Sequence, residues 1–63
     1  MDEVLKNLYN YLVINREKDL TEIDCLCVDG VTAENVIQLL KDLESKEKIS
    51  LDDTYLHCSI TVI

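Results

Sequence analysis

The sequence has no proline and only one glycine among its 63 residues. Because these two residues are the main interrupters of helices and strands, their scarcity predicts long regular elements with few breaks. No apolar run approaches the roughly 18 residues that a membrane-spanning helix requires, and the N-terminal residues lack the pattern of a signal peptide. We therefore expect an intracellular chain, cytoplasmic or nuclear, with no membrane among its partners.

Basic residues are scarce as well. Six Lys and Arg residues stand against thirteen Asp and Glu residues, for a formal net charge of -7. A broad nucleic-acid surface needs clustered Lys and Arg to replace the counterions of phosphates, so this balance disfavours such a surface. It disfavours anionic membrane surfaces for the same reason. The length allows one small domain, residues 1–63, with a correspondingly small core.

Histidine and cysteine are too few, and too awkwardly spaced, to predict a metal or catalytic site. The three cysteines cannot form a complete set of intramolecular disulfides, and reduced, mostly buried thiols are expected. In a helix, Cys25 and Cys27 would lie about 200° apart, and in a strand His57 and Cys58 would face opposite sides. The sequence also has no glycine-rich phosphate loop. We expect no metal, no cofactor, no catalytic residue and no enzymatic activity.

The clearest periodic pattern lies in residues 31–49. Thr32 is suited to be the N-cap, because its hydroxyl can accept a backbone N–H of the first turn. We predict one amphipathic helix over residues 33–47, with polar side chains on the opposite side. Its apolar stripe comprises Val36, Leu39, Leu40 and Leu43, widened by Ala33 and Ile37.

Two further helices are expected before this one. Residues 2–14 predict an amphipathic helix, residues 15–19 a charged loop, and Leu20 a return to the core. A T-x-x-D start at Thr21 predicts a short helix over residues 22–28, with Ile23, Leu26 and Cys27 on its inner face. Gly30 would then end it in the left-handed conformation. The apolar face of the first helix comprises Val4, Leu5, Leu8, Tyr11 and Leu12, with Tyr9 and Val13 extending it.

The period changes after residue 48. Residues 49–51 alternate, residues 52–54 form a turn cluster, and residues 55–62 alternate again, which predicts a β-hairpin. Leu56, Cys58, Ile60 and Val62 would face one side of it. The predicted fold is therefore α+β, a winged helix-turn-helix of three helices followed by a C-terminal β-hairpin.

The segments TEIDCLCVDGVTAENVIQLLKDLESKEKI and SLDDTYLHCSIT resemble the winged helix-turn-helix superfamily. Within it they are similar to the C-terminal winged-helix domain of the middle-sized subunit of eukaryotic replication protein A. That family has a Leu-rich third helix, a central isoleucine and a short wing, as Ile49, Asp52, Asp53 and Tyr55 stand here. The resemblance implies an acidic domain that recruits other proteins within a nucleic-acid-related assembly.

The favoured functional hypothesis is a non-catalytic protein–protein interaction module. Acidic side chains on the third helix and the wing would complement a partner with a basic or amphipathic segment and steer its approach. The apolar ending SITVI and the unpaired strand edges are typical of contact surfaces, although closure of the chain's own core or a homodimer would satisfy the same observation. The candidate protein-binding residues are Glu34, Gln38, Asp42, Asp52, Asp53 and Tyr55.

The alternative hypothesis is a small dimeric DNA-binding transcription regulator. Its contacts would come from Asn35, Gln38, Lys41 and Lys48, because Asn and Gln can read adenine and Lys can contact phosphate. Acidic neighbours leave the exposed side of that helix neutral, and Asp52 and Asp53 occupy the wing where a basic residue would serve DNA. Nucleic acid is therefore the disfavoured partner.

Overall fold

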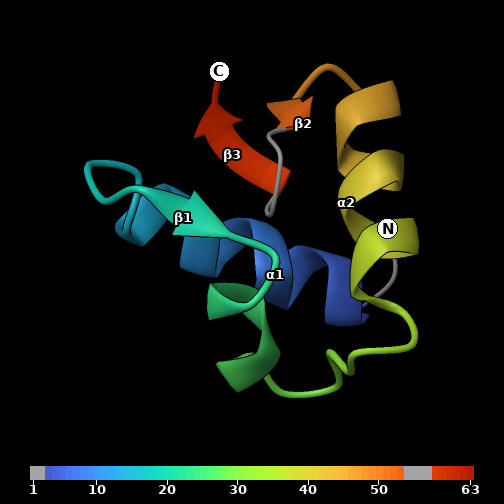
Figure 1. Cartoon of the computed structure of the whole chain (residues 1–63). Coiled ribbons are helices and arrows are strands. Elements are labelled where there is room, and N and C mark those ends of the chain that lie inside the picture. The colour runs from blue at the N-terminus through green and yellow to red at the C-terminus, as the bar shows by residue number, and fades with distance from the viewer. Residues whose placement is uncertain (1–2, 54–57) are drawn as a thin grey trace.

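The chain folds into two α-helices, one short 3-10 helix and three strands in the computed structural model, which describes residues 3–53 and 58–63. The described part is therefore α+β, but it holds two α-helices where the sequence predicted three. Residue 2 of the first predicted helix lies outside the described residues. So do residues 55–57 of the last predicted strand, which include Tyr55. In chain order the elements are α1 (Glu3–Ile14), β1 (Leu20–Thr21), η1 (Asp24–Cys27), α2 (Val36–Ser45), β2 (Ile49–Asp53) and β3 (Cys58–Val62) (Figure 1).

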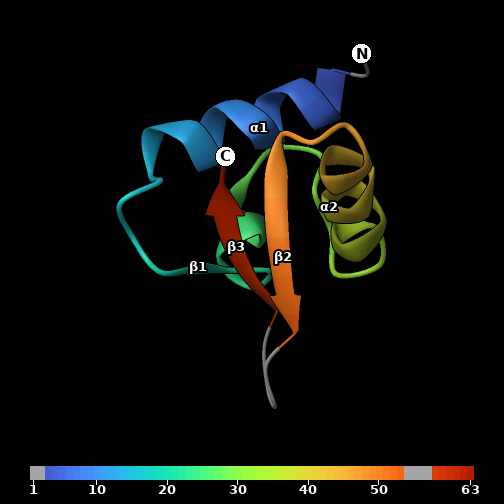
Figure 2. The same cartoon turned by 90° about the horizontal axis from the view of Figure 1, so that it is seen from above.

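The three strands form one antiparallel sheet in the order β1-β3-β2, so the last strand lies at its centre. Ile60 of β3 is paired with Leu20 on one side and with Leu51 on the other. Figure 2 shows the strands in this order, with α2 beside β2. The antiparallel pairing of β2 with β3 confirms the predicted C-terminal pair of strands, whereas β1 was not predicted because two residues carry no detectable period.

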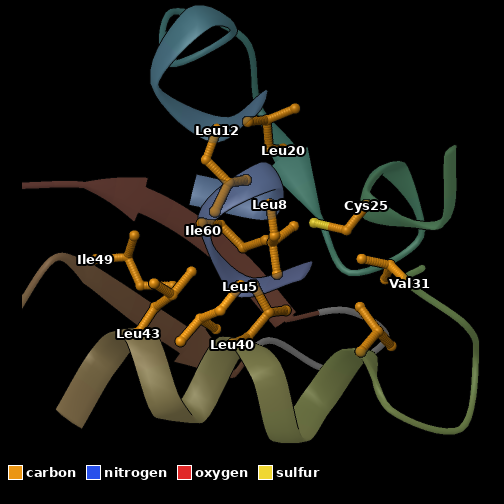
Figure 3. Close-up of a cluster of buried hydrophobic side chains, with 11 residues drawn as sticks. Leu5, Leu8, Leu12, Leu20, Cys25, Val31, Leu40, Leu43, Ile49 and Ile60 are labelled. Carbon is orange, nitrogen blue, oxygen red and sulfur yellow. The ribbon is translucent and has the colours of Figure 1, made fainter. Parts of the chain in front are cut away.

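The core lies between α1, α2 and the sheet (Figure 3). Leu5, Leu8 and Leu12 of α1 are buried, as predicted from their spacing. Cys58 and Ile60 are also buried, which confirms the predicted inner face of the last strand. From α2 the core receives Val36, Leu40 and Leu43, and from the start of β2 it receives Ile49.

The helix predicted over residues 33–47 is shorter at both ends. The Thr32 Oγ1 accepts the Asn35 backbone N–H at 3.3 Å, and the Thr32 carbonyl accepts the Val36 N–H at 2.9 Å. These bonds close the turn of residues 33–35, and the regular helix begins at Val36. The N-cap of α2 is Asn35, with no side-chain cap hydrogen bond, so the prediction that Thr32 is the N-cap is wrong. Ala33 is exposed there, so its predicted place in the core stripe is wrong.

The end of α2 is closed by a pair of reverse hydrogen bonds. The Lys48 N–H donates to the Leu43 carbonyl at 3.1 Å, and the Glu47 N–H donates to the Glu44 carbonyl at 2.9 Å. This is the Schellman arrangement, in which the residue just after the end of the helix takes the left-handed conformation. Glu47 takes that conformation, with a φ of 60°. A glutamate therefore occupies a backbone position that favours glycine.

The short helix η1 winds differently from the α-helix predicted over residues 22–28. It is a 3-10 helix of four residues, with three residues per turn instead of 3.6. At three residues per turn Glu22, Cys25 and Val28 fall in one row, and Cys25 is buried while Val28 packs against the core. The predicted inner face of Ile23, Leu26 and Cys27 is therefore wrong, since all three are exposed.

The turn after η1 depends on glycine, as predicted. Gly30 has a φ of +87°, in the left-handed region. A Cβ atom at this position would lie 2.7 Å from Cγ2 of Val4, so the turn also packs closely against α1. The single glycine of the chain thus sets the path from η1 into α2.

We predict that Glu47→Gly stabilises the protein by about 1 kcal/mol, because glycine adopts the left-handed conformation without the Cβ penalty. Urea unfolding followed by circular dichroism measures the change. Glu47→Ala is the matched control: it removes the carboxylate but keeps the Cβ, and it should leave the free energy of unfolding nearly unchanged. Equal effects from the two substitutions would contradict this account.

Candidate functional site

The outer side of α2 presents an aliphatic side chain to solvent. Val36, Leu40 and Leu43 face the core, and Ile37 lies about 100° around the helix from Val36. Its side chain is 42% exposed, so its predicted place in the core stripe is wrong. Ile37, in the first turn of α2, is therefore not one of the buried core residues.

Ile37 lies on the flank of α2 that faces β2. Seven residues later, Glu44 lies on the same flank, because seven residues make about two turns. Its Oε2 accepts the Leu51 backbone N–H at 3.1 Å, which ties that flank to the outer edge of β2. Gln38 and Lys41 lie within about 100° of Ile37 around α2, and Glu34 lies in the turn just before the helix; all three side chains are exposed. We name Glu34, Ile37, Gln38 and Lys41 together the α2–β2 face.

The structure brings together only part of the predicted protein-binding set. Glu34 and Gln38 both lie on the α2–β2 face. Asp42 lies about 140° around the helix from Ile37, and its Oδ1 accepts a hydrogen bond from Nζ of Lys46 at 2.8 Å. Asp52 is exposed and is paired with Ser59 in the sheet, on the side opposite the buried Ile60 row. The side chain of Asp53, like all of Tyr55, lies outside the described residues.

The residues of the DNA-binding alternative are divided in the same way. Asn35 is occupied within its own turn: its Oδ1 accepts the Thr32 N–H at 2.8 Å, and its Nδ2 donates to the Gly30 carbonyl at 3.1 Å. Nζ of Lys48 lies 5.1 Å from the ring centroid of Tyr9, so this cation rests against α1. Gln38 and Lys41 remain on the exposed surface of α2. The Asn35 side chain thus closes the turn before α2, and the cationic part of this set is reduced to Lys41.

Charge is distributed unevenly along the chain. Between Lys18 and Lys41 there are five acidic residues and no Lys or Arg. This stretch contains β1, η1 and the first half of α2. It also contains three exposed aliphatic side chains, Ile23, Leu26 and Ile37. A count of charges along the sequence would have found it, whereas the overall balance of charge did not locate it. The five residues are Asp19, Glu22, Asp24, Asp29 and Glu34.

Two of these carboxylates belong to the fold. The Glu22 Oε2 accepts the Cys58 backbone N–H at 2.6 Å and so extends the pairing beyond the end of β1. The Asp24 Oδ2 accepts the Thr21 N–H at 2.9 Å and the Thr21 hydroxyl at 3.3 Å. The predicted T-x-x-D start is therefore present in a different form, because the Thr21 hydroxyl bonds to the carboxylate instead of capping a backbone N–H.

The thiol and phenol groups beside η1 are shifted toward their neutral forms. Burial, followed by the nearby Asp24 carboxylate, raises the pKa of Cys25 from 9.0 to about 12. A hydrogen bond with Cys27, followed by burial, raises the pKa of Tyr11 from 10.0 to about 12. A thiol that remains protonated at neutral pH is a poor nucleophile and a poor metal ligand. Cys25 therefore behaves as a core residue.

Other kinds of site have no support among residues 3–53 and 58–63. In that part of the chain no three His, Cys, Asp or Glu side chains gather in a way that could hold a metal ion, and no pocket is found. The two α-helices have 12 and 10 residues, and no described helix has the length and apolarity to cross a membrane. The surface of α2 is thus the candidate site that the geometry offers.

No protein-family model matches this chain, and neither a curated protein nor a solved structure matches it.

We predict that the free energy of unfolding is constant from neutral pH to about pH 9 and falls between pH 9 and 12. In the unfolded chain the Cys25 thiol ionises near 9.0, but in the folded chain it holds its proton to about 12. The unfolded state therefore binds fewer protons over this interval, and stability decreases as pH rises. Tyr11 adds to the fall above pH 10.0. Urea unfolding at several pH values measures the change.

The double variant Cys25→Ser with Tyr11→Phe is the control for this pH effect. It removes both shifted groups, so its loss of stability over the same interval should be smaller than that of the wild type. Parallel curves for the two proteins would assign the alkaline loss to other groups.

Proposed function

We propose that this chain is a non-catalytic protein-interaction module of the winged helix-turn-helix type, acting in a nucleic-acid-related assembly. The architecture is supported by the order of elements, with η1 in place of the second helix and α2 in place of the third. It is also supported by the sheet order β1-β3-β2, in which a short strand between the first two helices joins the C-terminal pair. The type of assembly rests on the resemblance to the replication protein A domain.

One observation carries the proposed function: the exposed Ile37 at the centre of the α2–β2 face. The buried side chains that α2 gives to the core are Val36, Leu40 and Leu43, and Leu39 packs against that core partly buried. An exposed aliphatic side chain on a helix can serve as an anchor for an apolar side chain of a partner helix. We propose that Ile37 is that anchor, with Glu34 and Gln38 as its polar rim.

The charge of this region favours a basic partner. No Lys or Arg precedes Lys41 as far back as Lys18, and five carboxylates lie between them. Lys46 is paired with Asp42, and Lys48 rests on Tyr9. A phosphate backbone would meet more negative than positive charge here, whereas a basic segment would be steered toward the face. This balance supports protein over DNA as the partner.

The edge of β2 favours a helical partner over a strand. A strand that joined β2 would have to hydrogen-bond to the outward backbone groups of that edge. The outward N–H of Leu51 already donates to Glu44. A strand added to β2 would displace the Glu44 carboxylate from this N–H and leave the carboxylate without its partner. A helix that docks on the side chains of α2 requires less rearrangement than such a strand.

We predict that a synthetic amphipathic helix, with leucines on one face and lysines on the other, binds the wild-type chain and binds Ile37→Ser about tenfold more weakly. A factor of ten corresponds to about 1.4 kcal/mol, within the range for removing a central interface side chain. Fluorescence anisotropy of the labelled peptide measures the affinity. Ile14→Ser is the matched control, because Ile14 is 81% exposed at the end of α1 and lies outside this face.

The same assay at low salt with a labelled DNA duplex tests the alternative. We expect no change in anisotropy, because a phosphate footprint requires more cations than this surface provides. Salt-dependent DNA binding that is lost in Lys41→Ala or Gln38→Ala would contradict the proposal. Equal peptide affinity in wild type and Ile37→Ser would also overturn it, and so would an equal loss in Ile14→Ser.

A further inference from the structure

The winding of η1 leaves two aliphatic side chains outside the core. In a helix with three residues per turn, residues three apart lie one above the other. Glu22 and Cys25 form the inward row, which contacts β3 and the core. Ile23 and Leu26 form a second row, and these side chains are 58% and 40% exposed. The core is complete without them, because Cys25 fills the position beneath η1.

Carboxylates precede, separate and follow this row. Asp19, Asp24 and Asp29 are exposed, and Glu22 is half-buried against β3. The hydrogen bonds of Asp24 to Thr21 and of Glu22 to Cys58 fix two of the four carboxylates in place. The nearest basic residues in the sequence are Lys18 and Lys41. Ile23 and Leu26 therefore lie among carboxylates, and the segment between Lys18 and Lys41 supplies no Lys or Arg to offset this negative charge.

We infer that Ile23 and Leu26 form a second docking face, the η1 face, for a basic helix of another protein. Its two anchors are expected to be aliphatic side chains four residues apart. Three residues of a 3-10 helix rise about 6 Å, and four residues of an α-helix also rise about 6 Å, so two such pairs can meet side by side. Lysines or arginines next to the partner's anchors would lie opposite Asp24 and its neighbours. This face is separate from the α2–β2 face.

A second copy of the chain is a poorer occupant. In a two-fold interface the same patch meets itself, which would bring two sets of four carboxylates together. That repulsion opposes association when no cation lies between them. A head-to-tail contact through the exposed Ile14, with Arg16 and Lys18 beside it, would avoid the repulsion, and the experiment below distinguishes it.

The test is a titration of the full chain, labelled with ¹⁵N, with a synthetic lysine-rich helix that carries two leucines four residues apart. We expect the backbone amide signals of residues 22–28 to shift on binding. Ile23→Ser and Leu26→Ser should each weaken this site about tenfold, which is about 1.4 kcal/mol. Ile14→Ser should leave it unchanged. A peptide of the same composition with its leucines two residues apart should not bind, because they then lie on different sides of the helix.

The variants separate this inference from the proposed function. Ile37→Ser should weaken only the site reported by residues 34–41, and Leu26→Ser only the site reported by residues 22–28. Unchanged affinity at residues 22–28 in both Ile23→Ser and Leu26→Ser would overturn the inference. Absence of any shift there in the wild type would do the same. A molar mass that rises with concentration in light scattering, and that Ile14→Ser returns to the monomer, would assign the face to a second copy.

Discussion

The burial of Ile60 at the centre of β3 is the contact on which the rest of the structure depends. Its strand is the last in the chain but lies between the other two, paired through Ile60 to Leu20 and to Leu51. Residue 20 is far in sequence from residues 51 and 60, and a single row across the sheet brings the three together. In a chain of 63 residues, so few buried side chains must each contact several elements.

The sheet ends at two carboxylates, and this has a consequence for function. Glu22 accepts a backbone N–H of β3 where β1 stops, and Glu44 accepts one from the outer edge of β2. A short strand and a covered edge both reduce pairing with a foreign strand. Glu22 and Glu44 are therefore used to close the sheet. The exposed aliphatic side chains on α2 and η1, Ile37, Ile23 and Leu26, take no part in closing the sheet.

The sequence predicted those parts of the fold whose period is long enough to be recognised. Leu5, Leu8 and Leu12 repeat over three turns, and Cys58 and Ile60 alternate within a strand, so their burial followed from spacing. Leu20 was expected in the core, but a two-residue strand has no period of its own. The orientation of η1 could not be predicted, because the same residues bury Ile23 at 3.6 residues per turn and Cys25 at three. The number of residues per turn in η1 decides which of the two side chains is buried. The tight turn at Gly30 comes shortly after η1.

The candidate site was predicted less well than the fold for a related reason. A helical wheel gives angles around an axis, but which arc faces solvent depends on how wide a face the neighbouring elements cover. Here Leu5 and Ile49 lie against Leu40 and Leu43 in the core (Figure 3). Ile37 lies outside that arc and is exposed. Side-chain hydrogen bonds are also invisible to the wheel, so Asn35 was counted as a free amide although it closes a turn.

The exposed aliphatic residues of the central segment can be understood together. Ile23, Leu26 and Ile37 all lie in the stretch that has no Lys or Arg, and none of them is needed by the core. Ile23, Leu26 and Ile37 leave apolar surface in contact with water, which folded proteins tolerate at scattered positions. Carboxylates nearby keep such a surface soluble and repel a second copy of itself, while they attract a basic chain. On the proposed function, apolar anchors within negative charge would select a cationic partner.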